Sequence, residues 1–146
     1  MNITELLNWY QKAIETMKTE LENYADENKI WATSGEIKNS GGNLCLHIIG
    51  NLNHFIGATL GKTGYVRDRE AEFNLRGVSR SGLLEQLGDT TVMMEQVMNN
   101  LSAAELEATF PFDFAGKGST LQYLLYFYGH LQYHLGQINY HRRMIG

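Results

Sequence analysis

Apolar side chains recur at spacings of three and four residues along most of the chain, which predicts a series of amphipathic helices. In the first of them the apolar positions run from Leu6 to Leu21. Asn2 and Glu5 come before these positions in the pattern of a capping box. The four long helices predicted in this way cover about residues 2–24, 43–60, 81–100 and 119–143.

The connections between these helices carry turn-forming and helix-breaking residues. Residues 26–42 are rich in Ser, Asn and Gly, and residues 61–79 form a second long connection with a dense cluster of charges. Ser102 and Glu105 repeat the capping-box pattern and predict one short helix. The segment around Pro111 is expected to be extended, because proline cannot continue a helix. Four long helices joined in this way predict an all-α protein, a four-helix bundle.

Composition supports a single globular domain over residues 1–146. A chain of 146 residues can bury a core of its own, and its 43% hydrophobic content is typical of a soluble protein. The formal net charge of −4 excludes the strongly basic surface of a typical nucleic-acid-binding protein, so no nucleic acid is expected as a partner. Cys45 is the single cysteine and the N-terminus does not resemble a signal peptide, so we expect a cytoplasmic protein.

Two segments of helix length, residues 39–61 and 119–141, contain no Asp, Glu, Lys or Arg. Each is about long enough to cross a membrane. Their many amides and imidazoles would be costly in lipid, so we expect no membrane association and place both helices inside a bundle. All five histidines of the chain lie in these two segments. Imidazoles on buried helices need partners, and a divalent metal ion is the partner that suits three of them best.

His130 and His134 are four residues apart, so on a helix they share one face and can bind one ion. A third ligand must come from a facing helix, where His47 and His54 are the candidates. His141 lies about 10 Å further along the last helix, at a rise of roughly 1.5 Å per residue. Three neutral imidazoles leave coordination positions open, which is typical of catalytic sites. The alternative is that these histidines make ordinary hydrogen bonds or pack in a dimer contact.

Further side chains near the histidines are candidates for orienting them or a substrate. The polar candidates are Asn51, Gln137, Arg67 and Arg69. The two amides have interhelical hydrogen bonding as the alternative, and the two arginines have ion pairing on a solvated loop. Tyr123 and Phe127 share the histidine face and are either pocket lining or core. Each imidazole also needs a hydrogen-bond acceptor, and since neither histidine helix carries a carboxylate, the acceptor must come from elsewhere.

Four stretches resemble the DinB-like superfamily of small bacterial proteins: Gly42–Asn51, Ile56–Gly61, Tyr65–Phe73 and His130–Ile138. The resemblance extends over essentially the whole chain. It implies a four-helix bundle with up-down-down-up connectivity, commonly dimeric, that holds a divalent metal ion with three histidines. By position, the ligands implied are His47, His130 and His134. His54 falls where the family pattern calls for no ligand.

Characterised members of this superfamily include metal-dependent transferases that use low-molecular-weight thiols such as bacillithiol or mycothiol, and a thiol-dependent isomerase. The resemblance therefore implies a bacillithiol-type thiol S-transferase that acts on a small molecule as a homodimer. Three imidazoles with open positions suit zinc, nickel, iron or manganese, and the sequence does not select among them. Metal-dependent hydrolysis and a non-catalytic metal-binding dimer remain the alternatives.

Overall fold

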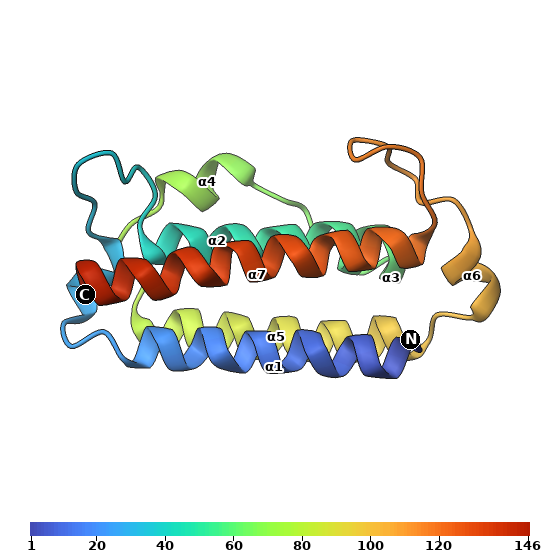
Figure 1. Ribbon diagram of the computed structural model, residues 1–146, viewed down its shortest axis with the longest axis horizontal. Helices are drawn as coiled ribbons and strands as arrows, with labels where there is room; N and C mark the ends of the chain where they lie inside the picture. Colours follow the sequence, from blue (N-terminus) through green and yellow to red (C-terminus); the bar gives the residue numbers. More distant parts are fainter.

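The computed structural model describes residues 1–146, which fold into helices without any strand. The long elements are α1 (Ile3–Glu22), α2 (Gly41–Leu52), α5 (Arg80–Asn99) and α7 (Thr120–Met144). Their axes lie lengthwise beside one another in Figure 1. The predicted all-α class is confirmed.

Side-chain caps fix where these helices begin. Asn2 and Glu5 form the predicted capping box at the start of α1, and Ser119 caps α7 by accepting from the Gln122 amide. The second helix starts two residues earlier than predicted, because the Ser40 side chain accepts a hydrogen bond from the Asn43 amide. The caps therefore define the helix starts more sharply than the apolar spacing does.

The predicted second helix is a continuous helical path that changes its pitch. After α2 the chain forms a π-helix, η2 (Asn53–Ala58), and one last turn, α3 (Thr59–Gly61). Lys62 ends the path in the left-handed conformation, with a φ of 54°. A π-helical segment widens the helix locally, and such segments are frequent at functional sites. Periodicity alone does not reveal it, because the apolar pattern continues through this stretch.

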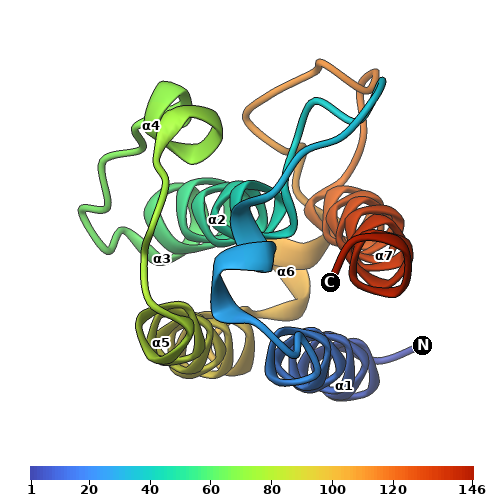
Figure 2. The ribbon, with the colours of Figure 1, turned by 90° about the vertical axis from the view of Figure 1, so that its left-hand side faces the viewer.

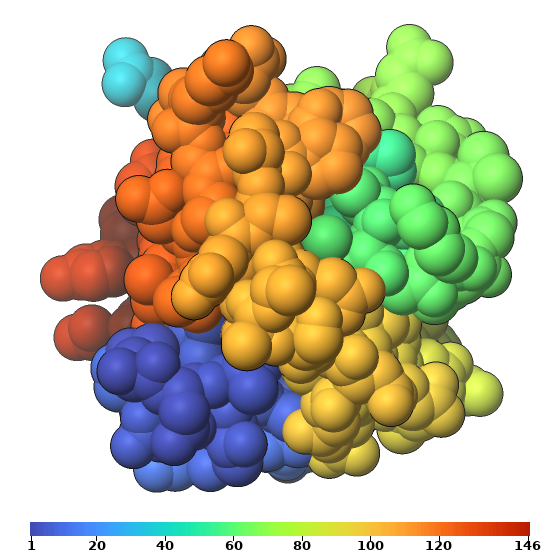
Figure 3. Space-filling model, turned by 90° about the vertical axis from the view of Figure 1, so that its right-hand side faces the viewer, coloured from blue at the N-terminus to red at the C-terminus, as the bar shows by residue number.

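Short helices occupy the connections. These are η1 (Glu27–Trp31), α4 (Arg69–Asn74) and α6 (Ala103–Glu107). The α6 helix has the predicted capping box of Ser102 and Glu105. The α4 helix was not predicted; it lies in the charged connection, where the Asp68 side chain caps it. Residues 101–119 pass over one end of the bundle, as Figure 3 shows, and a single bridge between Thr109 and Ser119 closes this loop.

The long helices form a four-sided bundle in which α1 contacts α5 and α7, and α2 also contacts α5 and α7 (Figure 2). The α4 helix packs on the outer side of α2. All residues of α2 are therefore buried, which explains why the segment carries no charge. No helix is long and apolar enough to cross a membrane.

Candidate metal centre

Three histidines converge between α2 and α7. His47 comes from α2, and His130 and His134 are one turn apart on α7. The Nε2 atom of His130 lies 3.2 Å from that of His47 and 3.0 Å from that of His134. Ligand atoms of all three lie within 4.8 Å of one another. The structure thus brings together the three histidines that the family resemblance implies.

The spacing of these nitrogens fits a shared metal ion. Two imidazoles bound at about 2.0–2.1 Å to one ion, with bond angles between a right angle and the tetrahedral angle, have nitrogens roughly 2.9–3.4 Å apart. The two Nε2 separations at His130 fall in this range. The donor set holds no carboxylate and no thiolate, so its three ligands are neutral. An ion bound here would keep its full charge and its open coordination positions.

Hydrogen bonds orient two of the three rings. His47 Nδ1 lies 3.0 Å from Glu72 Oε1, and His134 Nδ1 lies 2.7 Å from Gln137 Oε1. A carboxylate and an amide oxygen only accept, so each Nδ1 donates its proton. The lone pair of each ring is then on Nε2, which faces the cluster. Gln137 was a candidate from the sequence, and its contact with His134 gives it an orienting position.

Glu72, on α4, links His47 to an arginine. Its carboxylate accepts from Arg67 Nε at 2.8 Å and from an Arg67 terminal nitrogen at 2.8 Å. Burial alone would raise the pKa of Glu72, but the hydrogen bonds from His47 and Arg67 and the arginine charge outweigh it and lower that pKa. Glu72 is therefore an ionised acceptor for His47 at neutral pH.

Gly50 makes room for this carboxylate. A Cβ atom added at Gly50 would lie 1.9 Å from Glu72 Oε2, which is far inside van der Waals contact. Because α4 packs on α2 at this point, only glycine allows Glu72 to reach His47.

Burial keeps His130 and His134 neutral. It lowers the pKa of His130 to about 4, with further lowering from the neighbouring charges of His134 and His47. Burial also lowers the pKa of His134. Neutral imidazole is the form that binds a metal ion, so His130 and His134 can bind an ion without first losing a proton.

A cavity of about 310 Å³ adjoins His47 and His130. Its apolar walls are Phe55, Phe114, Tyr126 and Phe127, and its polar lining includes Asn51, Arg67 and Arg69. Phe127, Asn51 and both arginines, which were candidates from the sequence, therefore line this cavity. Tyr123 does not line this cavity: its hydroxyl donates to the Gly116 carbonyl and accepts from the Ala115 amide, which holds the loop before α7.

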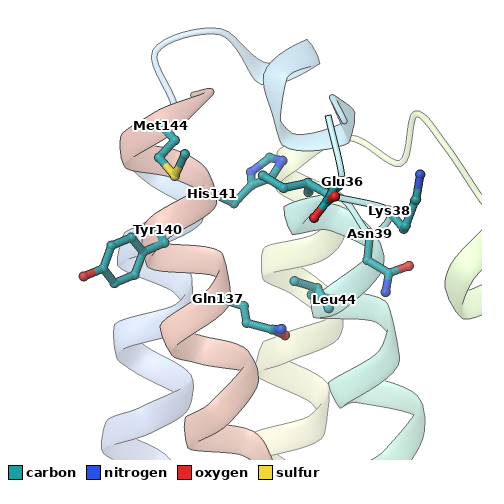
Figure 4. Close-up of a pocket in the computed structure, with 9 residues that line it drawn as sticks. Glu36, Lys38, Asn39, Leu44, Gln137, Tyr140, His141 and Met144 are labelled. Carbon is teal, nitrogen blue, oxygen red and sulfur yellow. The ribbon is translucent and has the colours of Figure 1, made fainter. Parts of the chain in front are cut away.

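The other two histidines lie outside the cluster. His54 is half-buried in the π-helix, beside the rings of Phe55 and Phe112. His141 is buried near the end of α7, where Nδ1 is 2.6 Å from the Tyr24 hydroxyl and Nε2 is 2.8 Å from the Ala32 carbonyl oxygen. This second position borders a separate cavity of about 430 Å³ (Figure 4). Its hydrogen bonds show that His141 ties the connection after α1 to α7.

Cys45 is inert in this environment. It is fully buried on α2, and burial raises the pKa of its thiol to about 12. A thiol without thiolate character is neither a metal ligand nor a nucleophile at neutral pH. Cys45 is therefore a small residue of the hydrophobic core.

Sequence reasoning missed the identity of the His47 acceptor and the role of Gly50. An acceptor from outside the histidine helices was expected, but nothing in the spacing pointed to Glu72 among the acids of the charged connection. The available signal was the stretch Tyr65–Phe73, which carries part of the family resemblance and contains both Arg67 and Glu72.

Comparison with known proteins places this chain in a family. A sequence model of the DinB superfamily matches residues 10–138, and the chain belongs to this superfamily. One similar solved structure is the crystal structure of a conserved protein from Enterococcus faecalis, with a TM-score of 0.79 and 13% sequence identity. The match covers 99% of this chain and 98% of that one, and it shows a common fold. No curated protein matches.

Proposed function

We propose that this protein is a divalent-metal-dependent enzyme, a thiol S-transferase of the bacillithiol type. The observation that carries the proposal is the convergence of three Nε2 atoms beside a cavity. Membership of the DinB superfamily supports it, because the resemblance implies both the ligand set and thiol chemistry. Zinc, nickel, iron and manganese all suit three imidazoles with open positions.

His47, His130 and His134 would hold the ion. When bound, the ion would lower the pKa of a coordinated thiol and so supply the thiolate, which is the nucleophilic form. Glu72 and Gln137 fix the rings of His47 and His134, so the ligands need little rearrangement. The aromatic walls of the cavity provide apolar contacts around the space in which a small electrophilic substrate would lie.

The proposal also covers the connectivity of the four long helices and the cellular compartment of the enzyme. We propose the up-down-down-up connectivity of the family, which the directions of the four long helices in Figure 1 support. We also propose a reducing compartment, the cytoplasm, because a chain with one buried cysteine forms no internal disulfide.

Metal analysis of protein purified without an affinity tag tests the metal centre. We expect about one ion per chain in the wild type, and loss of the ion in His47→Ala and His134→Ala. His54→Ala is the matched control, since it removes an imidazole from the same helical path outside the cluster. Metal-free wild-type protein whose stability does not change on adding zinc, nickel, iron or manganese would refute the metal centre.

A panel of thiols and electrophiles then tests the reaction. We expect turnover that requires both the ion and a low-molecular-weight thiol, and that disappears in His47→Ala. Turnover without any thiol would instead indicate hydrolysis by metal-activated water. Stoichiometric metal with no turnover in either assay would favour a non-catalytic metal-binding protein.

A further inference from the structure

Two of the three clustered histidines have a hydrogen-bond acceptor at Nδ1, and the third has none. Glu72 accepts from His47, and Gln137 accepts from His134. His130 Nδ1 is buried and has no partner. A histidine that binds a metal ion almost always donates its second ring N–H to an oxygen, which fixes the ring. His130 is therefore the one candidate ligand whose orienting group is still to be found.

Asn51 carries a buried oxygen without a partner at the same cavity. The residue is only 7% exposed, and its Oδ1 atom makes no hydrogen bond. Asn51 lies one turn after His47 on α2, which packs against α7, and it lines the cavity together with His130 (Figure 2). Only one other buried side-chain atom of the chain lacks a partner, Arg80 Nε at the start of α5. Two of the three unpaired atoms thus border one cavity from neighbouring helices.

The other asparagines of this helical path are paired, so the exception at Asn51 is local. Asn43 Nδ2 donates to two backbone carbonyls, both at 2.9 Å. Asn53 Nδ2 donates to the Ile49 carbonyl at 2.9 Å and to Thr90 at 3.0 Å. Buried amides nearly always have partners, and an unpaired Oδ1 calls for a hydrogen-bond donor.

The contacts of His130 Nε2 explain why its ring does not pair with Asn51 in this structure. His134 is neutral and donates from Nδ1 to Gln137, so its Nε2 atom holds a lone pair and only accepts. His130 Nε2 lies 3.0 Å from that atom, at hydrogen-bond distance. His130 is also neutral and has a single ring proton, which this contact places on Nε2. Its Nδ1 atom then has no proton to offer to Asn51.

Metal binding through Nε2 requires the other position of this proton. A ring that gives its Nε2 lone pair to an ion carries the proton on Nδ1. His130 Nδ1 would then be a buried donor, and a buried donor without an acceptor is costly. Asn51 Oδ1 is the buried acceptor at this cavity that no other group uses.

We propose that Asn51 is the positioning residue of His130: when the three histidines hold an ion, His130 carries its proton on Nδ1 and donates it to Asn51 Oδ1. Each candidate ligand then has its own acceptor, with Glu72 and Gln137 as the other two. The inference rests on the metal centre of the proposed function and does not depend on thiol transfer.

Imidazole NMR of protein with isotope-labelled histidine, recorded with and without zinc, tests the position of the proton. We expect the proton of His130 on Nε2 without zinc and on Nδ1 with zinc, while His134 keeps its proton on Nδ1 in both. In Asn51→Leu, the N–H resonance of zinc-bound His130 should shift, and the resonance of His134 should not.

Competition with a chromogenic chelator measures the effect on zinc affinity. Asn51→Leu keeps a side chain of similar size without an acceptor, and it should weaken zinc binding by roughly 10–100-fold. Asn51→Asp keeps an oxygen acceptor, so it should retain both the zinc affinity and the Nδ1–H resonance of His130.

Asn53→Leu is the matched control, because it removes an amide of the same helical path that bonds to Thr90 on α5 and does not line the cavity. It should lower the melting temperature of the metal-free protein but leave zinc affinity and the His130 resonance unchanged. Asn51→Leu should do the reverse, since its Oδ1 atom has no hydrogen bond to lose. This contrast shows that lost affinity is not lost folding.

The outcomes separate this inference from the proposed function. Stoichiometric zinc with wild-type affinity in Asn51→Leu overturns the inference alone, and so does zinc-bound His130 with its proton on Nε2. Zinc affinity that depends on Asn51 in a protein without thiol-transfer activity supports the inference and refutes the transferase. A wild type that binds none of zinc, nickel, iron and manganese overturns both.

Discussion

Gly50 affects the histidine cluster through the side chain that it lacks. Glu72 reaches His47 only because the α2 backbone is bare where the carboxylate crosses it. The absence of a side chain at Gly50 therefore lets Glu72 fix the ring orientation of His47, a candidate metal ligand. At the residue scale, the histidine cluster depends on the missing Cβ of Gly50 as well as on the side chains that make its contacts.

Gly50→Ala should therefore weaken metal binding without unfolding the protein. The added Cβ would displace the Glu72 carboxylate and release His47 from its acceptor, and loss of such a partner lowers metal affinity by roughly 10–100-fold. Competition with a chromogenic chelator measures the affinity. Gly88→Ala is the control, since a Cβ there meets nothing within 4 Å. It should leave metal affinity unchanged and raise stability by about 0.5–1 kcal/mol through helix propensity. Wild-type affinity in Gly50→Ala would show that Glu72 does not orient His47.

At the scale of elements, polar contacts join α1 to the last turns of α7. Glu20 on α1 accepts a hydrogen bond from Asn139 at 2.7 Å and pairs with Arg142. Burial alone would raise the pKa of Glu20, but hydrogen bonds from Arg142 and Asn139 outweigh it, so the pKa is lowered. Together with the contact of Tyr24 and His141, these groups fix α7 lengthwise against α1 and hence the position of His130 and His134.

Glu20→Gln should make the protein less stable at neutral pH, and the difference from the wild type should shrink in acid. A carboxylate whose pKa is lower in the folded state stabilises the fold above the unfolded-state pKa of about 4.3. This contribution is lost as the pH falls through the folded-state pKa. Because the pair is partly exposed, we expect at most about 1 kcal/mol at pH 7. Urea unfolding at pH 7 and pH 3 measures it.

Glu15→Gln is the matched control for this prediction. Glu15 pairs with Lys18 on the exposed side of α1, so its replacement should change stability by less than about 0.5 kcal/mol. A Glu20→Gln protein with the same difference from the wild type at both pH values would contradict the assigned pKa direction.

At the scale of the whole molecule, the outer face of α7 has no partner within the chain. It exposes Leu125, Tyr133 and Tyr140, and it carries no charge from residue 119 to residue 141. Gly129 and Gly136 lie in open space and would let another helix approach closely. We propose a second copy of the chain as the occupant, because an uncharged face pairs with itself without like-charge repulsion.

Sedimentation or light scattering should then give the mass of a dimer. Tyr133→Glu, in the middle of this face, should shift the mass to that of a monomer, since it would place two carboxylates in the contact. Val92→Glu on α5 is the control, because Val92 is also exposed but lies outside this face. A monomeric wild type at micromolar concentration would refute the dimer.

Local rules made the helices and the α7 histidine pair predictable from the sequence. Capping residues and apolar spacing define α1, α5 and α7 closely, and the i, i+4 spacing places His130 and His134 on one face. The π-helix and α4 were not predictable, since neither changes the apolar pattern enough to be seen. Spacing left His47 and His54 as equal candidates, and the family resemblance implied His47. The choice depends on how α2 is rotated against α7, which is a tertiary property.

The distance along the chain between the ligands bears on when the site can form during synthesis. His47 precedes His130 by 83 residues, and Glu72, which accepts the hydrogen bond that orients His47, lies within the first half of the chain. A nascent chain that has left the ribosome through α5 contains both His47 and Glu72, yet it offers an ion only one of the three clustered imidazoles. Bringing His47 and His130 together closes a long loop of chain, which costs conformational entropy. Few contacts offset this cost until α7 packs against α2. Metal capture at the proposed centre would therefore be one of the last events in the making of this protein, and a chain truncated before α7 would lack two of the three candidate ligands.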